Sequence, residues 1–156
     1  MREIGERGSE KGMKADEKTA GEVVEAMTSL LGAYEAHNLE QVMDLYAPDP
    51  DATALGTNLD QFLTGSEAIR QAYGEDFDAF GRIGLKMMEH QVSAEGGVAW
   101  LSAKCLASFE IDGDEISTRS RLTAVLVRRT GQWKVIQFHL SFPSDESGIE
   151  IPVSRL

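Results

Sequence analysis

The side chains of this chain best suited to acid–base chemistry are one histidine, His139, and two aspartates, Asp51 and Asp60. His139 is predicted to lie across a strand pair from Arg121, which would suit either an anion-binding pair or a positioned acid or base. The alternative, which base rates favour, is a structural polar network inside a subunit interface. Asp51 and Asp60 flank a short predicted strand, where a carboxylate could shuttle protons, although aspartate in turn-rich sequence is usually a turn or cap residue.

The remaining candidate ligands and nucleophiles do not form a recognisable site. His37 follows a predicted helix end and His90 stands beside Glu89 in a predicted strand, so neither has a partner at ligand spacing. His-Glu-x-x-His and Cys-x-x-Cys motifs are absent from the sequence. Cys105 is the single cysteine and falls on an apolar strand face, where cysteine usually acts as a small hydrophobe. The sequence therefore predicts no metal site and no cofactor.

Composition and charge exclude several classes of protein. The 156 residues fit one domain with a real core, and 42% of them are apolar. A net charge of −11 without a basic stripe argues against nucleic-acid binding. No apolar run approaches the roughly 20 residues that cross a membrane, and the charged N-terminus does not resemble a secretory signal. With one cysteine, no internal disulfide can form. These features together predict a cytoplasmic protein.

Hydrophobic spacing predicts three helices in the first half of the chain. Residues 1–15 are rich in Gly and charged residues and are predicted to be a disordered tail. A helix then starts near Thr19, a shorter one covers 39–47 after Asn38, and a third starts near Ser66. The first helix is predicted to bury Tyr34. The residues expected on the buried faces of the other two helices are Val42, Met43, Tyr46, Ile69, Ala72, Tyr73, Phe77 and Phe80.

The second half alternates apolar and polar residues with a period of two. Strands are predicted over 85–94, 97–111, 115–129 and 132–142, and a short one lies within 51–57. The separators contain turn-forming glycines. This order predicts an α+β fold, with helices on one face of a curved antiparallel sheet. The domain is expected to cover 16–145, followed by a C-terminal tail over 146–156.

Turn chemistry predicts the pairing of the last three strands. Asp112-Gly113 suits a two-residue type I′ turn, which pairs Phe109 with Ile116. The next turn is predicted to be a three-residue loop over 129–131, which places Arg128 opposite Gln132. A one-residue slip would put Val127 against Lys134 and mismatch the two faces.

The predicted pairing separates an apolar face from a mixed one. The apolar face is rich in small residues, so it can leave a pocket beneath the helices, although large helix residues could equally fill the space. The predicted pocket residues are Tyr34, Tyr46, Tyr73, Phe77, Leu101, Ala103, Cys105, Leu122, Ala124, Phe138 and Leu140. The mixed face is too apolar for plain surface and predicts a homodimer interface. Its predicted residues are Trp100, Arg121, Thr123, Val125, Trp133, Gln137, His139 and Ser141.

Three sequence phrases resemble one family over about residues 18–143. LLGAYEAHNLEQVMDLYAPD, GVAWLSA and RRTGQWKVIQFHLSFP are similar to the paired first helices and terminal strands of SnoaL-like proteins, which have the nuclear transport factor 2-like fold. The last phrase also resembles the association domain of calcium/calmodulin-dependent kinase II. The resemblance implies a cone-shaped α+β domain with three helices on the concave face of the sheet, a pocket, and back-to-back pairing of sheets.

The same resemblance leaves the function open, because this fold hosts ketosteroid isomerase-like enzymes, cyclases, dehydratases, epoxide hydrolases and oligomerisation domains. The kinase association domain lines its cavity with arginines, and the resemblance puts Ala124 and Leu140 at two of those places. An apolar, uncharged ligand is therefore favoured over a small carboxylate. Two hypotheses follow. The first is a small-molecule-binding protein or lyase/isomerase-type enzyme acting on an apolar metabolite. The second is a non-catalytic association module with a vestigial pocket.

Overall fold

The computed structural model describes residues 12–144, which form three helices and six strands. The helices are α1 (Glu17–Glu35), α2 (Leu39–Leu45) and α3 (Ser66–Ala79). The strands are β1 (Thr53–Leu55), β2 (Phe62–Thr64), β3 (Ile83–Glu95), β4 (Val98–Ile111), β5 (Asp114–Arg129) and β6 (Gln132–Ser141). The predicted α+β order is confirmed. Strand β2 was not predicted, because the sequence around it, 58–65, is rich in turn-forming residues.

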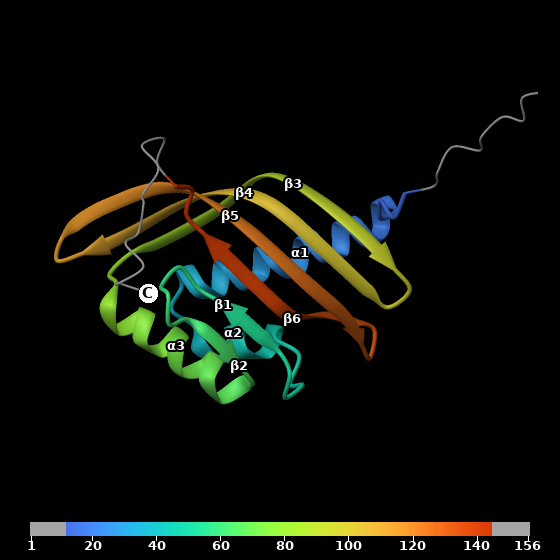
Figure 1. The fold of residues 1–156 in the computed structure, drawn as a ribbon, viewed down its shortest axis with the longest axis horizontal. Coiled ribbons are helices and arrows are strands. Elements are labelled where there is room, and N and C mark those ends of the chain that lie inside the picture. Colours follow the sequence, from blue (N-terminus) through green and yellow to red (C-terminus); the bar gives the residue numbers. More distant parts are fainter. Residues whose placement is uncertain (1–11, 145–156) are drawn as a thin grey trace, which may run out of the picture.

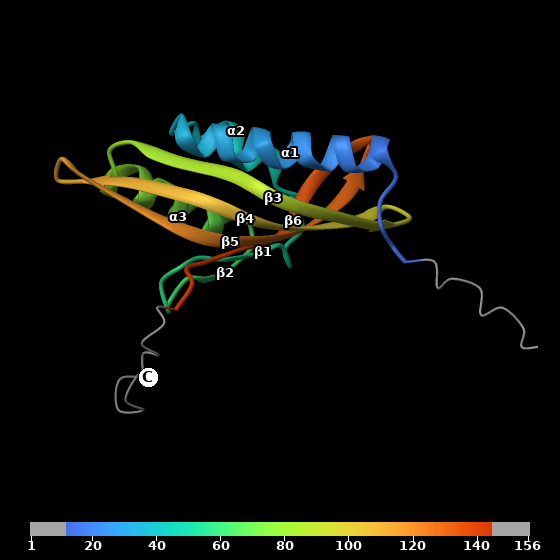
Figure 2. The same cartoon turned by 90° about the horizontal axis from the view of Figure 1, so that it is seen from above.

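The six strands form one curved, open sheet in the order β2-β1-β6-β5-β4-β3, with β1 parallel to β6 and the other neighbours antiparallel. Figure 1 shows α1 crossing behind the long strands and α3 lying beside β2. Figure 2 shows α1 and α2 on one side of the sheet. The concave face beneath the helices is called the inner face below, and the opposite face is called the outer face.

Side-chain alternation explains which face is buried. Along β4, Ala99, Leu101 and Ala103 are at most 8% exposed, whereas the intervening Ser102 and Lys104 are exposed. Because side chains alternate with a period of two, the buried residues of β4 all lie on the inner face. The β4–β5 turn has positive φ at Asp112 and Gly113, as a type I′ turn requires. The predicted pairing of Phe109 with Ile116 is confirmed.

The N-terminal boundary lies earlier than predicted. Ala94 donates a backbone hydrogen bond to Met13 O over 2.9 Å, and Ala15 donates to Val92 O over 3.2 Å. Lys14 also forms an antiparallel bridge with Ser93. The segment 13–15 therefore extends the sheet beside β3, and the prediction that the tail reaches residue 15 is wrong for these three residues. The other predicted tail residues, 1–11 and 146–156, lie outside the described part.

The predicted loop between β5 and β6 is also wrong. Thr130 and Gly131 both have positive φ, so the turn has two central residues, and Arg129 rather than Arg128 lies opposite Gln132. Near the turn Val127 does pair with Lys134, the arrangement that was expected to mismatch the faces. A β-bulge resolves the mismatch, because the register shifts between Val125 and Leu126 and leaves Ile136 of β6 without a partner.

This bulge moves Trp133 to the opposite face from the one predicted. Trp133 is 6% exposed, and its indole Nε1 donates to Glu22 Oε2 of α1 over 3.0 Å. Arg128 donates to the same carboxylate over 3.2 Å, and its guanidinium carbon lies 4.7 Å from the Trp133 ring centroid. The predicted place of Trp133 in an outer-face interface is therefore wrong, since the side chain holds α1 against the sheet.

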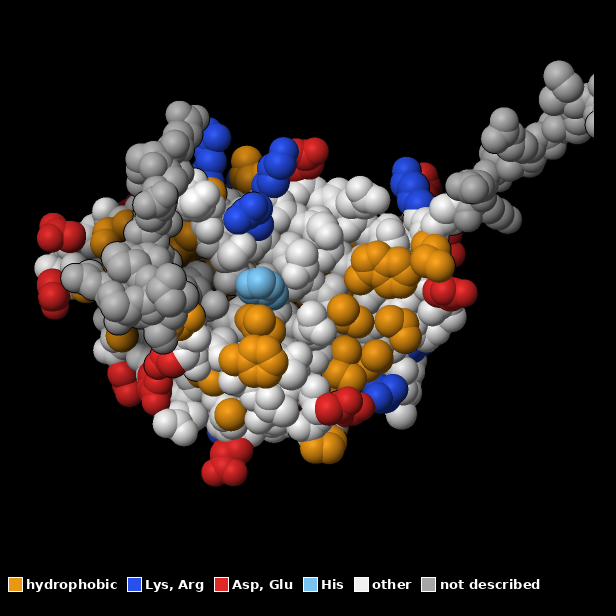
Figure 3. All heavy atoms as spheres, in the orientation of Figure 1, with side chains coloured by type: hydrophobic (Ala, Val, Ile, Leu, Met, Phe, Trp, Pro, Cys, Tyr) orange, Lys and Arg blue, Asp and Glu red, His pale blue; other side chains and the backbone are white. Residues whose placement is uncertain are grey.

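The outer face keeps the other seven residues of the predicted interface. The register places Trp100 beside Val125, Val125 beside Gln137, and Thr123 beside His139. Arg121 lies opposite Ser141 and not opposite His139, so the predicted partner of Arg121 is wrong by two residues along β6. Figure 3 shows hydrophobic side chains gathered over one part of this face, with no helix covering them. Within residues 12–144, no helix is long and apolar enough to cross a membrane.

We expect Trp133→Phe to lower the free energy of unfolding by about 1–2 kcal/mol, because the Glu22 carboxylate loses a partly buried donor. Chemical denaturation measures the change. In a double-mutant cycle with Glu22→Ala, the two losses should be less than additive. Full additivity would contradict the assignment of Trp133 to the α1 contact.

Candidate functional site

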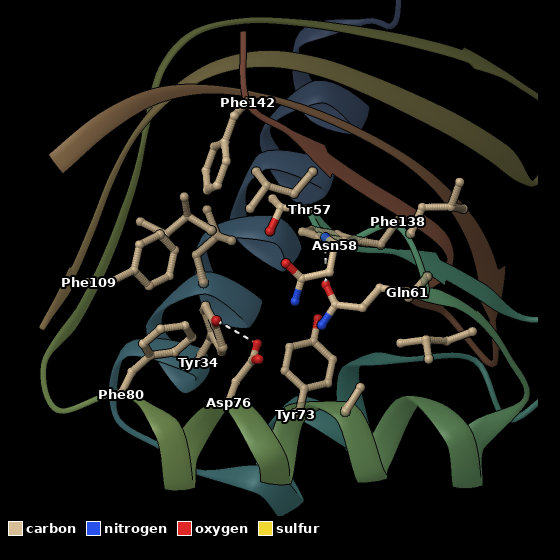
Figure 4. Close-up of a pocket in the computed structure, with 18 of the residues that line it drawn as sticks. Tyr34, Thr57, Asn58, Gln61, Tyr73, Asp76, Phe80, Phe109, Phe138 and Phe142 are labelled. Carbon is tan, nitrogen blue, oxygen red and sulfur yellow. Dashed lines mark hydrogen bonds between the residues drawn. The ribbon is translucent and has the colours of Figure 1, made fainter. Parts of the chain in front are cut away.

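A cavity of about 280 Å³ opens between the inner face of the sheet, α1, α3 and the β1–β2 loop. Most of its wall is apolar, and Figure 4 shows its polar side chains gathered between Phe80 and Phe109 on one side and Phe138 on the other. The lining residues are Leu30, Leu31, Tyr34, Ala54, Leu55, Gly56, Thr57, Asn58, Gln61, Leu63, Ala72, Tyr73, Asp76, Phe80, Leu85, Phe109, Ile111, Ile116, Thr118, Phe138, Leu140 and Phe142. This distribution suits a largely apolar ligand that carries one polar group.

Asp76 is the acidic residue among those that line the cavity. It projects from α3, and its Oδ2 accepts a hydrogen bond of 2.9 Å from the Tyr34 hydroxyl of α1. Its Oδ1 has no donor among the described residues. One carboxyl oxygen is thus held by the protein, and the other is available to a ligand.

Burial alters the acid–base properties of this pair. Desolvation raises the pKa of Asp76 above its ordinary value, and the Tyr34 hydrogen bond opposes that shift only in part. Desolvation and the nearby Asp76 carboxylate both raise the pKa of Tyr34, so its hydroxyl stays protonated and remains a donor. A carboxyl with a raised pKa in an apolar cavity is suited to taking up and returning a proton.

A second hydroxyl pair supports the same part of the cavity. The hydroxyls of Tyr46 and Tyr73 lie 2.8 Å apart, and burial raises the pKa of both. Tyr46 is 3% exposed and does not line the cavity, whereas Tyr73 does. The Tyr34 and Tyr73 rings meet edge to face with centroids 5.5 Å apart. Tyr46 therefore positions the Tyr73 hydroxyl beside the ligand space.

Four of the predicted pocket residues line this cavity, namely Tyr34, Tyr73, Phe138 and Leu140. The others lie elsewhere. Phe77 stacks on His37 with centroids 4.7 Å apart, and Tyr46 lies behind Tyr73. The remaining five, Leu101, Ala103, Cys105, Leu122 and Ala124, are buried on the inner face away from the cavity. The space above them is taken up by core packing with α1, which the sequence left as an open alternative.

The predicted chemical residues are not brought into the cavity. Asp51 and Asp60 are both exposed and do not line it. His139 lies on the outer face, next to Thr123. Burial raises the pKa of the Cys105 thiol to about 11, so the group stays protonated at neutral pH and is a poor nucleophile. The residues described contain no cluster of three or more histidine, cysteine or acidic side chains placed to hold a metal ion.

Asp76 was missed although its spacing carried a signal. Ile69, Tyr73 and Phe80 recur along α3 at helical intervals, and Asp76 falls in phase with them. An acid on the apolar face of an amphipathic helix must be paired or functional, because a buried charge is costly. The predicted carboxylates, Asp51 and Asp60, flank a strand, so the prediction did not include this helical position.

A family model for the SnoaL-like domain matches residues 23–145, and the chain belongs to this family. A search of curated proteins found no match. Among solved structures, a nuclear transport factor 2-like superfamily protein from Salmonella enterica has 17% identity, covers 88% of this chain and 99% of its own, and gives a TM-score of 0.77.

Two further solved structures share the fold. A protein from Streptomyces avermitilis, provisionally named a dehydratase of the same family, has 18% identity, covers 83% of this chain and 99% of its own, and gives a TM-score of 0.75. A provisional calcium/calmodulin-dependent protein kinase II association domain from Xanthomonas campestris has 22% identity, covers 85% and 95%, and gives 0.72. At these identities the similarity establishes the nuclear transport factor 2-like fold.

We expect Tyr34→Phe to raise the pKa of Asp76 further, because the hydroxyl that stabilises its ionised form is removed. Titration of the Asp76 side-chain carbon by carbon-13 NMR measures the change. Tyr73→Phe is the matched control, since Tyr73 donates no hydrogen bond to Asp76 and the pKa should move less. An unchanged or lowered pKa in Tyr34→Phe would contradict this coupling.

Proposed function

We propose that this protein binds a neutral, largely apolar metabolite and catalyses a proton transfer of the lyase or isomerase type, with Asp76 as the proton shuttle. The observation that carries the proposal is a carboxyl of raised pKa, held by a tyrosine hydroxyl, inside an apolar cavity. The alternative, an association module with a vestigial pocket, is favoured by a cavity that has only apolar walls, and this cavity does not fit that description.

The chemistry needs few groups. As carboxylate, Asp76 removes a proton from a carbon of the ligand, using the oxygen that Tyr34 does not hold. In an isomerisation the same carboxyl returns the proton to a second carbon. In an elimination the proton passes to a leaving hydroxide and forms water. The Tyr73 hydroxyl can donate to the ligand oxygen on which negative charge develops.

Charge and shape support a neutral ligand. The cavity wall, as far as residues 12–144 form it, contains no lysine, arginine or histidine, so an anionic ligand would meet Asp76 without a counter-ion. Phe80, Phe109 and Phe142 offer aromatic surface on one side of the polar side chains, which suits a ring system. The provisional dehydratase name of one solved structure belongs to the same broad reaction class.

Replacing the carboxyl tests the proposal. We expect the wild-type protein to accelerate exchange of the proton next to the carbonyl of 1-indanone or 1-tetralone in deuterated water, and Asp76→Asn to lose about 100-fold or more of that rate. Proton NMR follows the exchange. Asp51→Asn and Asp60→Asn are matched controls, because both carboxyls are exposed and outside the cavity. Equal rates for wild type and Asp76→Asn would exclude Asp76 as the shuttle.

We also propose that the outer face mediates a homodimer, which would cover its apolar part. Trp100, Val125 and Val98 lie side by side there, and Val98 is 40% exposed. The polar members Thr123, Gln137, His139 and Ser141 surround them along β5 and β6. A mixed apolar and polar patch of this kind is typical of subunit interfaces.

We expect light scattering at micromolar concentration to give twice the chain mass of 17.1 kDa. Val125→Asp should shift the protein to monomer, because it would bury an unpaired charge at the centre of the interface. Gln41→Glu adds the same charge at an exposed position of α2 and should leave the mass unchanged. A monomeric wild-type protein would contradict the dimer.

A further inference from the structure

The β1–β2 loop places a carboxamide among the polar side chains of the cavity, across from Asp76. Gln61 and Asn58 both line the cavity and come from this loop, whereas Asp76 and Tyr73 come from α3 (Figure 4). The carboxamide thus comes from a different element than the Asp76–Tyr34 pair and shares no hydrogen bond with it.

One hydrogen bond fixes which end of the Gln61 carboxamide faces the ligand. The Asn58 backbone N–H lies 3.2 Å from Gln61 Oε1. Since a backbone N–H can only donate, the carboxamide oxygen must be the atom on that side. The Gln61 Nε2 then carries two N–H donors, and it has no acceptor among the described residues. Gln61 is half-buried, and its Nε2 is not among the fully buried unpaired atoms of the described residues, so both donors are open to a ligand or to water in the cavity.

Gly56 supplies the space in which this side chain lies. A methyl group on Gly56 would lie 2.7 Å from Gln61 Cδ, well inside van der Waals contact. The φ of Gly56 does not lie in the left-handed region, so alanine is compatible with the backbone there. The absence of a side chain at position 56 therefore serves the close approach of Gln61 rather than the turn itself.

We propose that Gln61 determines specificity by donating its amide N–H to a carbonyl oxygen of the ligand, so that the site selects apolar ketones over their hydrocarbon analogues. This inference deepens the proposed function and rests on it for the identity of the site. The ketone oxygen would lie between the Gln61 amide and the Tyr73 hydroxyl, and the carbon next to the carbonyl would face Asp76. A carbonyl is also the group that makes such a carbon acidic enough for a carboxylate to deprotonate.

A matched pair of probes tests this inference by binding alone, without turnover. Equilibrium dialysis would compare 2-acetylnaphthalene with 2-ethylnaphthalene, which differ in the carbonyl oxygen. We expect the wild-type protein to prefer the ketone by about fivefold or more, the range of one neutral hydrogen bond. Gln61→Ala and Gly56→Ala should each abolish the preference while the affinity for 2-ethylnaphthalene stays within about twofold, which also shows that the variants are folded.

The double variant separates a specific role from a general disturbance. If Gly56 acts only through Gln61, adding Gly56→Ala to Gln61→Ala should change the ketone preference no further. A wild-type protein that binds both probes equally, or a Gln61→Ala variant that keeps the preference, would overturn the inference. If the wild-type protein shows the Gln61-dependent ketone preference but accelerates no proton exchange, the proposed catalysis is refuted and the recognition role of Gln61 stands. If 1-(2-naphthyl)ethanol binds as tightly as 2-acetylnaphthalene, and its binding also depends on Gln61, the proposal that the site selects ketones is overturned.

Discussion

The phase of the long strands relative to the helices is the constraint on which the rest of this structure depends. Side chains of β4, β5 and β6 must point alternately toward α1 and away from it, and a shift of one residue would exchange the two sets. The β6 bulge at Ile136 shifts the alternation by one residue, so apolar side chains on both sides of the bulge point toward the inner face. It lets Trp133 and Val135 pack on the helix side and keeps Phe138 and Leu140 on that same side, in the cavity wall.

The cavity holds one carboxyl group, Asp76, whose burial disfavours its charged form. Asp76 is partly desolvated, and the Tyr34 hydroxyl offsets that penalty in part. Both residues lie on helices rather than on loops, which favours a precise placement of the pair. Gln61, the proposed recognition group, instead lies on a short loop outside the helices and the long strands.

The two faces of the sheet carry separable tasks. The inner face holds the core and the cavity, while the outer face carries Trp100 and Val125, which belong to the proposed subunit interface. The same fold supports both enzymes and association domains, so the side chains in the cavity decide between them. Here Leu140 lines the cavity and Ala124 is buried, and the acid comes from α3. This combination supports the proposed neutral ligand and the proposed proton transfer.

The sequence by itself determined the α+β class, the order of the elements, the β4–β5 register and the family, because these follow from local periodicity and turn chemistry. It placed Tyr34, Tyr73, Phe138 and Leu140 on buried faces for the same reason. Only the tertiary structure decided the face of Trp133, since a bulge has no periodic signature before strands are paired. It also decided that Asp76 meets Tyr34, 42 residues away in sequence, because that contact depends on how α3 packs across the open end of the sheet.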